Sequence, residues 1–346
     1  MNLSVNGLGM VSRLGDQDDL KELFTNSNPI DPRSMPLNHT LPMDIPADFN
    51  IAQQLLRRMS HFSKISLLSA GKAIKDSGFN LTGKAVGIIQ GSVYGPIISG
   101  LQAFDDLIDF GDNQLSPTNF SGSVFNTSAT YLSLAYGIQG PTLSHTCGMD
   151  TLYHSLLTAS LWLESGAVDY VLVGIGDEYT SYFDDGFQSG DPHFRSTPGL
   201  LPDCEGWTTF LVSRDETAKY GRIECGCLKS LPQTRDKKII YSVWHEQRTP
   251  ASFLNHASKN QACFPGFLRG FYPSAAAFDL ALALICVNAG RFPMVDGSEG
   301  HYRIQKMDAR EKIRCYSISE NGDLFYYETP YDNKEYLIPE KSGESC

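Results

Sequence analysis

Two sulfur-containing side chains stand just before a segment that the sequence predicts to be a buried helix. Cys147 and Met149 lie within Gly140–Asp150, and residues 151–165 carry apolar side chains on nearly every face of a helix. The first turn of a buried helix gathers unpaired N–H groups and the positive end of the helix dipole, which favour a thiolate. This is where a cysteine nucleophile would be placed, and the residue standing there decides the chemistry.

The ends of this helix can be predicted from residue type. Asp150 and Thr151 are the expected N-cap residues, and Gly166 stands where a C-terminal stop is expected. A carboxylate at Asp150 would repel a thiolate beside it. We interpret Cys147, two residues before Met149, as a small buried core residue in preference to a displaced nucleophile.

These motifs resemble those of the β-ketoacyl synthases of fatty-acid and polyketide synthesis. In that family a Gly-Pro pair is followed by a short strand, an Ala-Cys elbow and a buried helix that ends in Gly. Counting forward from Pro141 or back from Gly166 places Met149 at the position of the family's nucleophilic cysteine. A thioether has no ionisable proton and cannot take an acyl group from a thioester, so the resemblance implies that condensation is closed to Met149.

The resemblance implies further losses in the second half of the chain. His245 aligns with the first catalytic histidine of the family, whereas Phe271 replaces the second histidine and Gly266 replaces the lysine. Condensation uses a thiolate and two histidines. We therefore expect no catalytic residue in this chain, and we interpret the retained His245 as held by structural hydrogen bonds.

A further matching stretch, Ser116–Thr127, corresponds to the part of ketoacyl synthases that lies at the subunit interface and lines the acyl tunnel. The resemblance assigns this tunnel or interface role to Phe120, Val124, Phe125 and Asn126. On spacing alone, the apolar members of this set would be ordinary core residues. Both interpretations stay open at this stage.

The resemblance also implies the fold. It is an α/β, thiolase-like, five-layered αβαβα fold of two similar halves, with residues 1–222 as the N-terminal half and 223–346 as a shortened C-terminal half. Periodicity and turn residues predict the elements. Strands are expected at 2–10, 86–92, 169–178, 239–244, 313–318 and 324–327, and helices at 49–76, 101–111, 151–165 and 275–289.

Composition limits the class of protein. The chain has 346 residues, 41% hydrophobic and 19% charged, which is typical of a soluble globular protein. It begins without a basic leader, and its longest apolar run, 281–287, is too short to span a bilayer, so we expect no membrane contact and a cytoplasmic location. Eight cysteines without metal-ligand spacing indicate reduced thiols and no metal.

The net charge of −11 argues against binding to nucleic acid. It also makes the surface a poor dock for acyl carrier proteins, which are acidic as a class, so a partner subunit would have to bind the carrier. The resemblance is closest to the chain-length factors of bacterial type II polyketide synthases. These are inactive homologues that pair with a catalytic ketosynthase and help to shape the tunnel that sets polyketide chain length.

We therefore expect a non-catalytic chain-length factor in a heterodimer with a ketosynthase. No cofactor is expected, because the substrate would arrive on the phosphopantetheine of an acyl carrier protein bound by the partner. Two alternatives remain open. The first alternative is the corresponding factor of an aryl polyene pathway. The second is an active thiolase-fold acyltransferase or condensing enzyme that uses Cys147.

Overall fold

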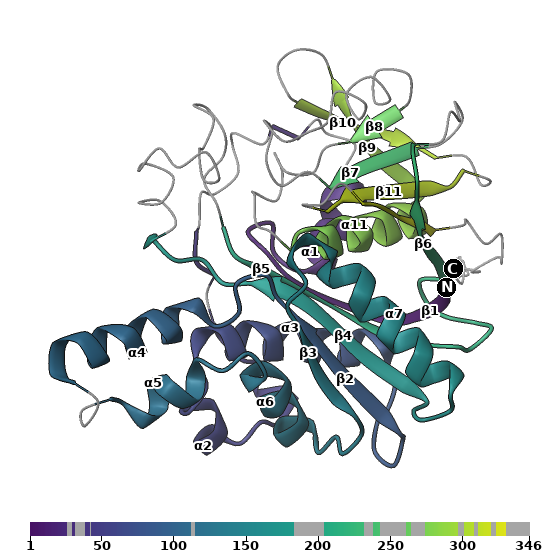
Figure 1. Cartoon of the computed structure of the whole chain (residues 1–346). Helices are drawn as coiled ribbons and strands as arrows, with labels where there is room; N and C mark the ends of the chain where they lie inside the picture. The colour runs from purple at the N-terminus through teal and green to yellow at the C-terminus, as the bar shows by residue number, and fades with distance from the viewer. Residues whose placement is uncertain are drawn as a thin grey trace, which may run out of the picture.

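The computed structural model describes most of the chain. The described residues are 1–25, 30–31, 39–41, 43–111, 115–182, 204–231, 238–242, 261–263, 274–296, 301–307, 311–319 and 323–329. Within them the structure is a mixed α/β arrangement built on one large sheet, as Figure 1 shows.

The large sheet has ten strands in the order β3-β2-β4-β5-β1-β6-β12-β11-β7-β8. From the first part of the chain come β1 (Asn2–Val11), β2 (Val86–Gly91), β3 (Thr142–His145), β4 (Tyr170–Asp177) and β5 (Gly206–Ser213). From the second come β6 (Arg222–Leu228), β7 (Lys238–Ser242), β8 (Gln261–Cys263), β11 (Ile313–Ile318) and β12 (Leu324–Thr329). Strands β9 (Arg291–Asp296) and β10 (His301–Lys306) form a separate antiparallel pair.

The strand order separates the two parts of the chain. Strands that precede residue 222 occupy one end of the sheet and later strands occupy the other, with β1 and β6 paired antiparallel where they meet. The boundary predicted at 222/223 thus falls at the start of β6, and the division into two similar halves stays a prediction. At the outer end of the first part, β3 pairs with β2 alone among the described residues and forms an edge of the described sheet.

The helices with their bounds are α1 (Gln17–Thr25), η2 (Ala47–Phe49), α2 (Gln53–Leu56), α3 (His61–Ser77), α4 (Ile97–Phe110), α5 (Pro117–Gly122), α6 (Thr127–Tyr136), η4 (Gly148–Asp150), α7 (Thr151–Glu164) and α11 (Ala276–Ala289). Helices α3 and α6 pack on one face of the first-part strands, and α7 and α11 pack on the other (Figure 1). Because side chains alternate along a strand, neighbours on β2 enter opposite cores: Ile88 lies with α3 and α6, and Ile89 with α7 and α11.

Helices α7 and α11 were both predicted to be buried on nearly every face, but the structure buries them to different extents. Helix α11 is buried from Ala276 to Val287, in agreement with its apolar sequence. Helix α7 is buried on one side, but Leu161 is 56% exposed. The expectation of burial on nearly every face is therefore wrong for α7, which lies towards the free edge of the sheet rather than at its centre.

Close packing of β1 on α3 depends on glycine. A Cβ at Gly9 would lie 2.0 Å from the carbonyl oxygen of Ser69, so only glycine allows the strand to approach the helix backbone. The hydroxyl of Ser69 in turn donates to the carbonyl of Gly9 at 3.0 Å. These contacts fix α3 across the middle of the first-part strands.

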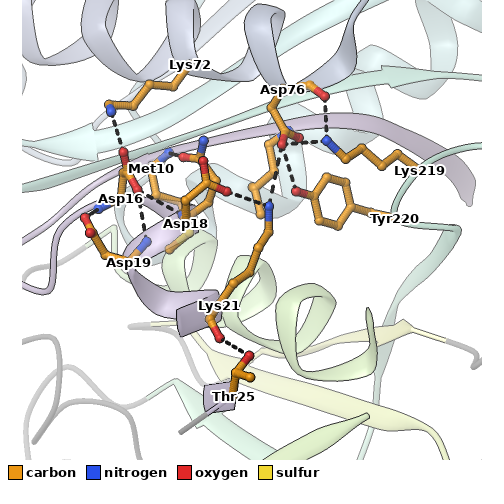
Figure 2. Close-up of polar contacts among 12 residues, drawn as sticks. Met10, Asp16, Asp18, Asp19, Lys21, Thr25, Lys72, Asp76, Lys219 and Tyr220 are labelled. Carbon is orange, nitrogen blue, oxygen red and sulfur yellow. Dashed lines mark hydrogen bonds and ion pairs between the residues drawn. The ribbon is translucent and has the colours of Figure 1, made fainter. Parts of the chain in front are cut away.

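A network of charged side chains fastens α1 to α3 (Figure 2). Asp76, near the end of α3, forms an ion pair with Lys219 at 2.8 Å and accepts a hydrogen bond from the Tyr220 hydroxyl at 3.2 Å. Lys21 on α1 lies 3.7 Å from the same carboxylate, and Lys72 on α3 pairs with Asp16 at 2.6 Å. The network connects three segments of the fold and serves as a structural clamp.

Candidate functional site

The turn between β3 and α7 is held by a threonine hydroxyl. The strand ends at His145, and Gly148 adopts a left-handed φ of 56° that favours glycine. The Thr151 hydroxyl accepts a hydrogen bond from the Cys147 backbone N–H at 3.0 Å and donates one to the Gly148 carbonyl at 2.6 Å. The helix begins at Thr151 with Asp150 as its N-cap, as the sequence predicts.

Met149 lies in η4, directly before the first turn of α7. It is partly buried, and η4 packs against β11 from the second part of the chain. The sulfur nearest to the positive end of the helix dipole in sequence is therefore a thioether. It has no proton to lose and cannot act as a nucleophile towards a thioester.

Cys147 differs from its expected position. It lies beyond the end of β3 and is exposed, so its interpretation as a buried core residue is wrong. Its Sγ lies 3.7 Å from Nδ1 of His145, and Nε2 of the same ring lies 3.3 Å from the Thr158 hydroxyl. That hydroxyl donates to the His154 carbonyl at 2.9 Å, so it accepts from His145 Nε2–H and leaves Nδ1 as the acceptor facing the thiol.

The electrostatics of this pair keep both groups neutral. Partial burial and the negative charge of Asp150 raise the pKa of the Cys147 thiol. Burial and the neighbouring His154 lower the pKa of His145. The effect of Asp150 expected from the sequence is confirmed. His145 is placed as a base for the thiol, but the thiolate is not favoured in the resting site.

The residues predicted to line a tunnel or interface lie on the surface. Phe120 is 58% exposed, Val124 42% and Phe125 49%, so the alternative that they are ordinary core is wrong. The Phe125 ring packs against Gly95, where an added Cβ would lie 2.4 Å from the ring. Asn126 is exposed and forms the N-cap of α6, with its carbonyl accepting from the Thr130 backbone N–H at 3.0 Å.

These residues are part of a larger exposed apolar surface, which we call the apolar face. Helix α4 packs on α5, and α6 packs on the edge strand β3, so the surface is carried by neighbouring elements. Its members are Phe104, Leu107, Ile108, Phe110, Phe120, Val124, Phe125, Leu134 and Leu143. An exposed apolar surface of this extent beside a free sheet edge marks an interaction site.

Three positions predicted from the resemblance, His245, Gly266 and Phe271, lie outside the described residues. Their roles stay predictions. Within the part of the chain that the structure does describe, no three His, Cys, Asp or Glu side chains are grouped as a metal site requires. No helix among those residues is both long and apolar enough to cross a membrane.

The sequence reasoning missed a buried polar cluster at the end of β4. Asp177 accepts hydrogen bonds from the Ser92 hydroxyl at 2.6 Å and the backbone N–H groups of Val93 at 2.9 Å, Tyr94 at 3.1 Å and Ser274 at 3.1 Å. Burial raises the pKa of the Asp177 carboxyl, and these donors act in the opposite direction. The residue connects the loop after β2 with the segment before α11.

Two further carboxylates and a histidine complete this cluster. Glu178 accepts the backbone N–H of Ile98, in the first turn of α4, at 2.9 Å. Glu205 bonds to His61 Nε2 at 2.8 Å and to the Tyr179 backbone N–H at 3.2 Å. A signal was present in the sequence, because β4 ends at Asp177 and is followed directly by a second acid, Glu178.

Comparisons with known proteins agree with this architecture. Residues 37–191 match the family model described as "Beta-ketoacyl synthase, N-terminal domain". A 3-oxoacyl-[acyl-carrier-protein] synthase 2 of Coxiella burnetii is 26% identical over 189 residues, which cover 51% of this chain and 45% of the relative. The match thus spans about half the length of that curated relative.

Solved structures resemble nearly the whole chain. A β-ketoacyl synthase from Burkholderia phymatum gives a TM-score of 0.70 at 15% identity, covering 95% of this chain and 99% of that one. The structure of a type II PKS acyl-carrier protein in complex with its ketosynthase bound to the hexaketide gives a TM-score of 0.68 at 14% identity. The match covers 96% of this chain and 99% of that one. The structure of the ishigamide ketosynthase/chain length factor gives a TM-score of 0.67 at 12% identity. The match covers 96% of this chain and 100% of that one.

The fold is therefore the thiolase-like α/β fold of ketosynthases, as the sequence predicts. The family model that matches residues 37–191 and the curated relative are both β-ketoacyl synthases, and the solved structures show that the fold is shared over nearly the whole chain. Among the solved structures of this fold are a type II polyketide ketosynthase and a ketosynthase/chain length factor.

Proposed function

We propose that this chain is a non-catalytic chain-length factor. It pairs with a ketosynthase of a type II polyketide synthase and helps to shape the tunnel that holds the growing chain. The observation that carries the proposal is Met149 in η4, directly before α7, at the position that the resemblance assigns to the nucleophilic cysteine. Without an ionisable sulfur there, the partner subunit makes the carbon–carbon bond.

The apolar face supports the need for a partner. Phe120, Val124 and Phe125 are exposed together with the free edge of β3, which a second subunit would cover. The acyl chain arrives on the phosphopantetheine of a carrier protein docked on that subunit, and the chain itself needs no cofactor. The factor of an aryl polyene pathway would use the same kind of pair, so the product distinguishes the two pathways.

Reconstitution tests the proposal. The chain is tagged in its native host, and the ketosynthase that co-purifies with it is identified by mass spectrometry and expressed with it. We expect condensation from the pair, none from this chain alone, and complete loss when the ketosynthase cysteine is replaced by Ala. Condensation by the purified chain alone would contradict the proposal.

In the same pair, replacing Phe125 by Ala is expected to lengthen the product by one or more two-carbon units, because a large ring is removed from the predicted tunnel wall. Phe125 is 49% exposed, so its truncation should cost less stability than the ~2–5 kcal/mol of a buried site. Product masses are compared with those of a matched variant, Phe79→Ala, whose ring packs on Tyr170. Unchanged products from a folded F125A pair would exclude Phe125 from the tunnel.

A second candidate function follows from the position of Cys147 beside His145. In it the chain accepts an acyl group: the Cys147 sulfur bonds to a thioester carbonyl carbon, the thioester C–S bond breaks, and the leaving thiolate takes the proton that His145 received from Cys147. We expect adduct formation to accelerate up to and above the ordinary thiol pKa, because that of Cys147 is raised.

Mass spectrometry after incubation with an acyl thioester decides between the two candidates. A wild-type adduct that is lost in Cys147→Ser supports the second, with His145→Asn slowing it. An unmodified chain under these conditions rejects it.

A further inference from the structure

Basic residues are absent from a long stretch of this chain. No Lys or Arg occurs between Lys84 and Arg195, although the same stretch contains Asp and Glu, three of them on α4. Its described part includes α4, α5, α6 and β3, which carry the apolar face. On this face α4 supplies the carboxylates, and none of the four elements supplies a permanent cation.

Helix α4 shows the arrangement most clearly. Leu101, Phe104 and Ile108 recur at helical spacing and form an apolar stripe, on which Phe104 is 64% and Ile108 78% exposed. Asp105 and Asp109 are four residues apart and exposed, and the helical repeat places them along one flank of the stripe. A partner that covers the stripe must also meet these two carboxylates.

The third acidic residue of α4 has an internal role that the other two lack. Asp106 accepts hydrogen bonds from the Ser116 backbone N–H at 3.3 Å and from Asn119 Nδ2 at 3.1 Å, which holds α5 against α4. No hydrogen bond or ion pair engages Asp105 or Asp109 within the described residues. Their charges are available to a partner.

We infer that the apolar face selects its partner by charge. It docks on a ketosynthase whose facing surface carries Lys or Arg beside an apolar area, and Asp105 and Asp109 oppose the docking of a second copy of this chain. The inference rests on the proposed function, in which the partner is a ketosynthase. It adds the chemistry of the partner surface and the residues that discriminate between pairing and self-association.

The reason is electrostatic. Two copies that met through α4 would bring the carboxylates of two α4 helices to one interface, and residues 85–194 supply no Lys or Arg to compensate them. Like charges across an interface suppress the wrong pairing, whereas opposite charges steer the correct one. Added salt screens both effects, so it should move the two associations in opposite directions.

Salt dependence gives the first test. The affinity of the chain for the co-purified and identified ketosynthase, and the self-association of the chain, are both measured by analytical ultracentrifugation in NaCl between about 0.05 M and about 1 M. We expect the affinity for the ketosynthase to fall about tenfold or more over this range. Self-association should increase over the same range.

Charge reversal gives the second test. Asp105→Lys/Asp109→Lys is expected to weaken ketosynthase binding about tenfold at low salt, whereas Asp105→Asn/Asp109→Asn, which removes the like charges, is expected to promote self-association. The control Glu22→Lys/Glu216→Lys makes the same change in net charge at exposed residues outside the apolar face and should bind within about twofold of wild type. All four positions are exposed, and circular dichroism confirms folding of each variant.

The outcomes separate this inference from the proposed function. If the ketosynthase binds but the Asp105/Asp109 variant behaves like its control, charge selection is wrong and the pairing itself stands. If a folded wild-type chain binds no ketosynthase at any salt concentration, the proposed function fails, and the inference fails with it.

Discussion

Replacing Asp177 by Ala is expected to lower the free energy of unfolding by roughly 3–5 kcal/mol, because it removes the acceptor of four donors, two of them buried and two partly buried. One carboxylate oxygen accepts from the Ser92 hydroxyl and from the N–H groups of Val93 and Tyr94, and the other accepts from Ser274 N–H. Asp177 is only 2% exposed, so water cannot replace the lost acceptor without entering the core. Urea unfolding monitored by circular dichroism gives the measurement.

Two variants calibrate this result. Asp177→Asn keeps the shape of the side chain and one acceptor, so its loss of stability should be smaller than that of Asp177→Ala. Asp44→Ala removes an exposed carboxylate and should change the free energy of unfolding by less than about 0.5 kcal/mol. A loss in Asp177→Ala as small as that in Asp44→Ala would show that the four hydrogen bonds do not hold β4 to the loop after β2 and to the segment before α11.

Regular elements could be predicted from the sequence wherever the apolar pattern was continuous. The strand predicted at 86–92 is β2 (Val86–Gly91), and the helix predicted at 275–289 is α11 (Ala276–Ala289). The helix predicted at 49–76 is instead interrupted before α3, where the Ser60 hydroxyl accepts the Ser63 backbone N–H as an N-cap. That capping signal was present in the sequence but was outweighed by the apolar periodicity.

The candidate site was predicted less completely, because exposure depends on strand order. Cys147 was expected to be buried, but it follows β3, which the order of the sheet places at an edge. The same edge leaves Leu143 and the neighbouring helix α6 without a covering layer. Local sequence does not show which strand lies at the edge of a sheet. These residues could therefore be identified from the sequence, but their exposure could not be predicted.

The acidic cluster was missed for a related reason. Antiparallel pairing of β4 with β5 sets Asp177 opposite Gly206, so that Glu178 and Glu205, which flank this pair, come together although they are far apart in sequence. Long-range register of this kind is not visible in either strand alone. The result is a cluster of buried carboxylates with few positive charges near them.

This cluster predicts how stability depends on pH. Burial raises the pKa of Glu178 from 4.5 to about 7, and the charges of Glu205 and Asp177 add to the rise, while the Ile98 N–H and His61 oppose it. Between these two pKa values the folded chain binds more protons than the unfolded chain, so the contribution of Glu178 to stability is present at low pH and lost as the pH rises towards and through 7. The loss amounts to about 3 kcal/mol.

His61 adds a contribution with the same sign. Burial alone would lower its pKa, but the hydrogen bond and charge of Glu205 and the charge of Glu178 outweigh burial, so its pKa is raised above 6.5. Its contribution is therefore complete below 6.5 and is lost as the pH rises through the raised value. The His61 window begins at 6.5 and overlaps the upper end of the Glu178 window, so mutation is needed to separate the two contributions.

Glu178→Gln is the variant that isolates the effect. Glutamine keeps an acceptor for the Ile98 N–H, and with it the anchor of α4, but it cannot ionise. We expect the stability of Glu178→Gln relative to wild type to increase by about 2.5 kcal/mol between pH 5 and pH 8, measured by urea unfolding at each pH. Glu216→Gln, at an exposed position, should show no such change. A constant difference across this range would mean that Glu178 is already ionised throughout, and that the cluster holds α4 with a permanent charge.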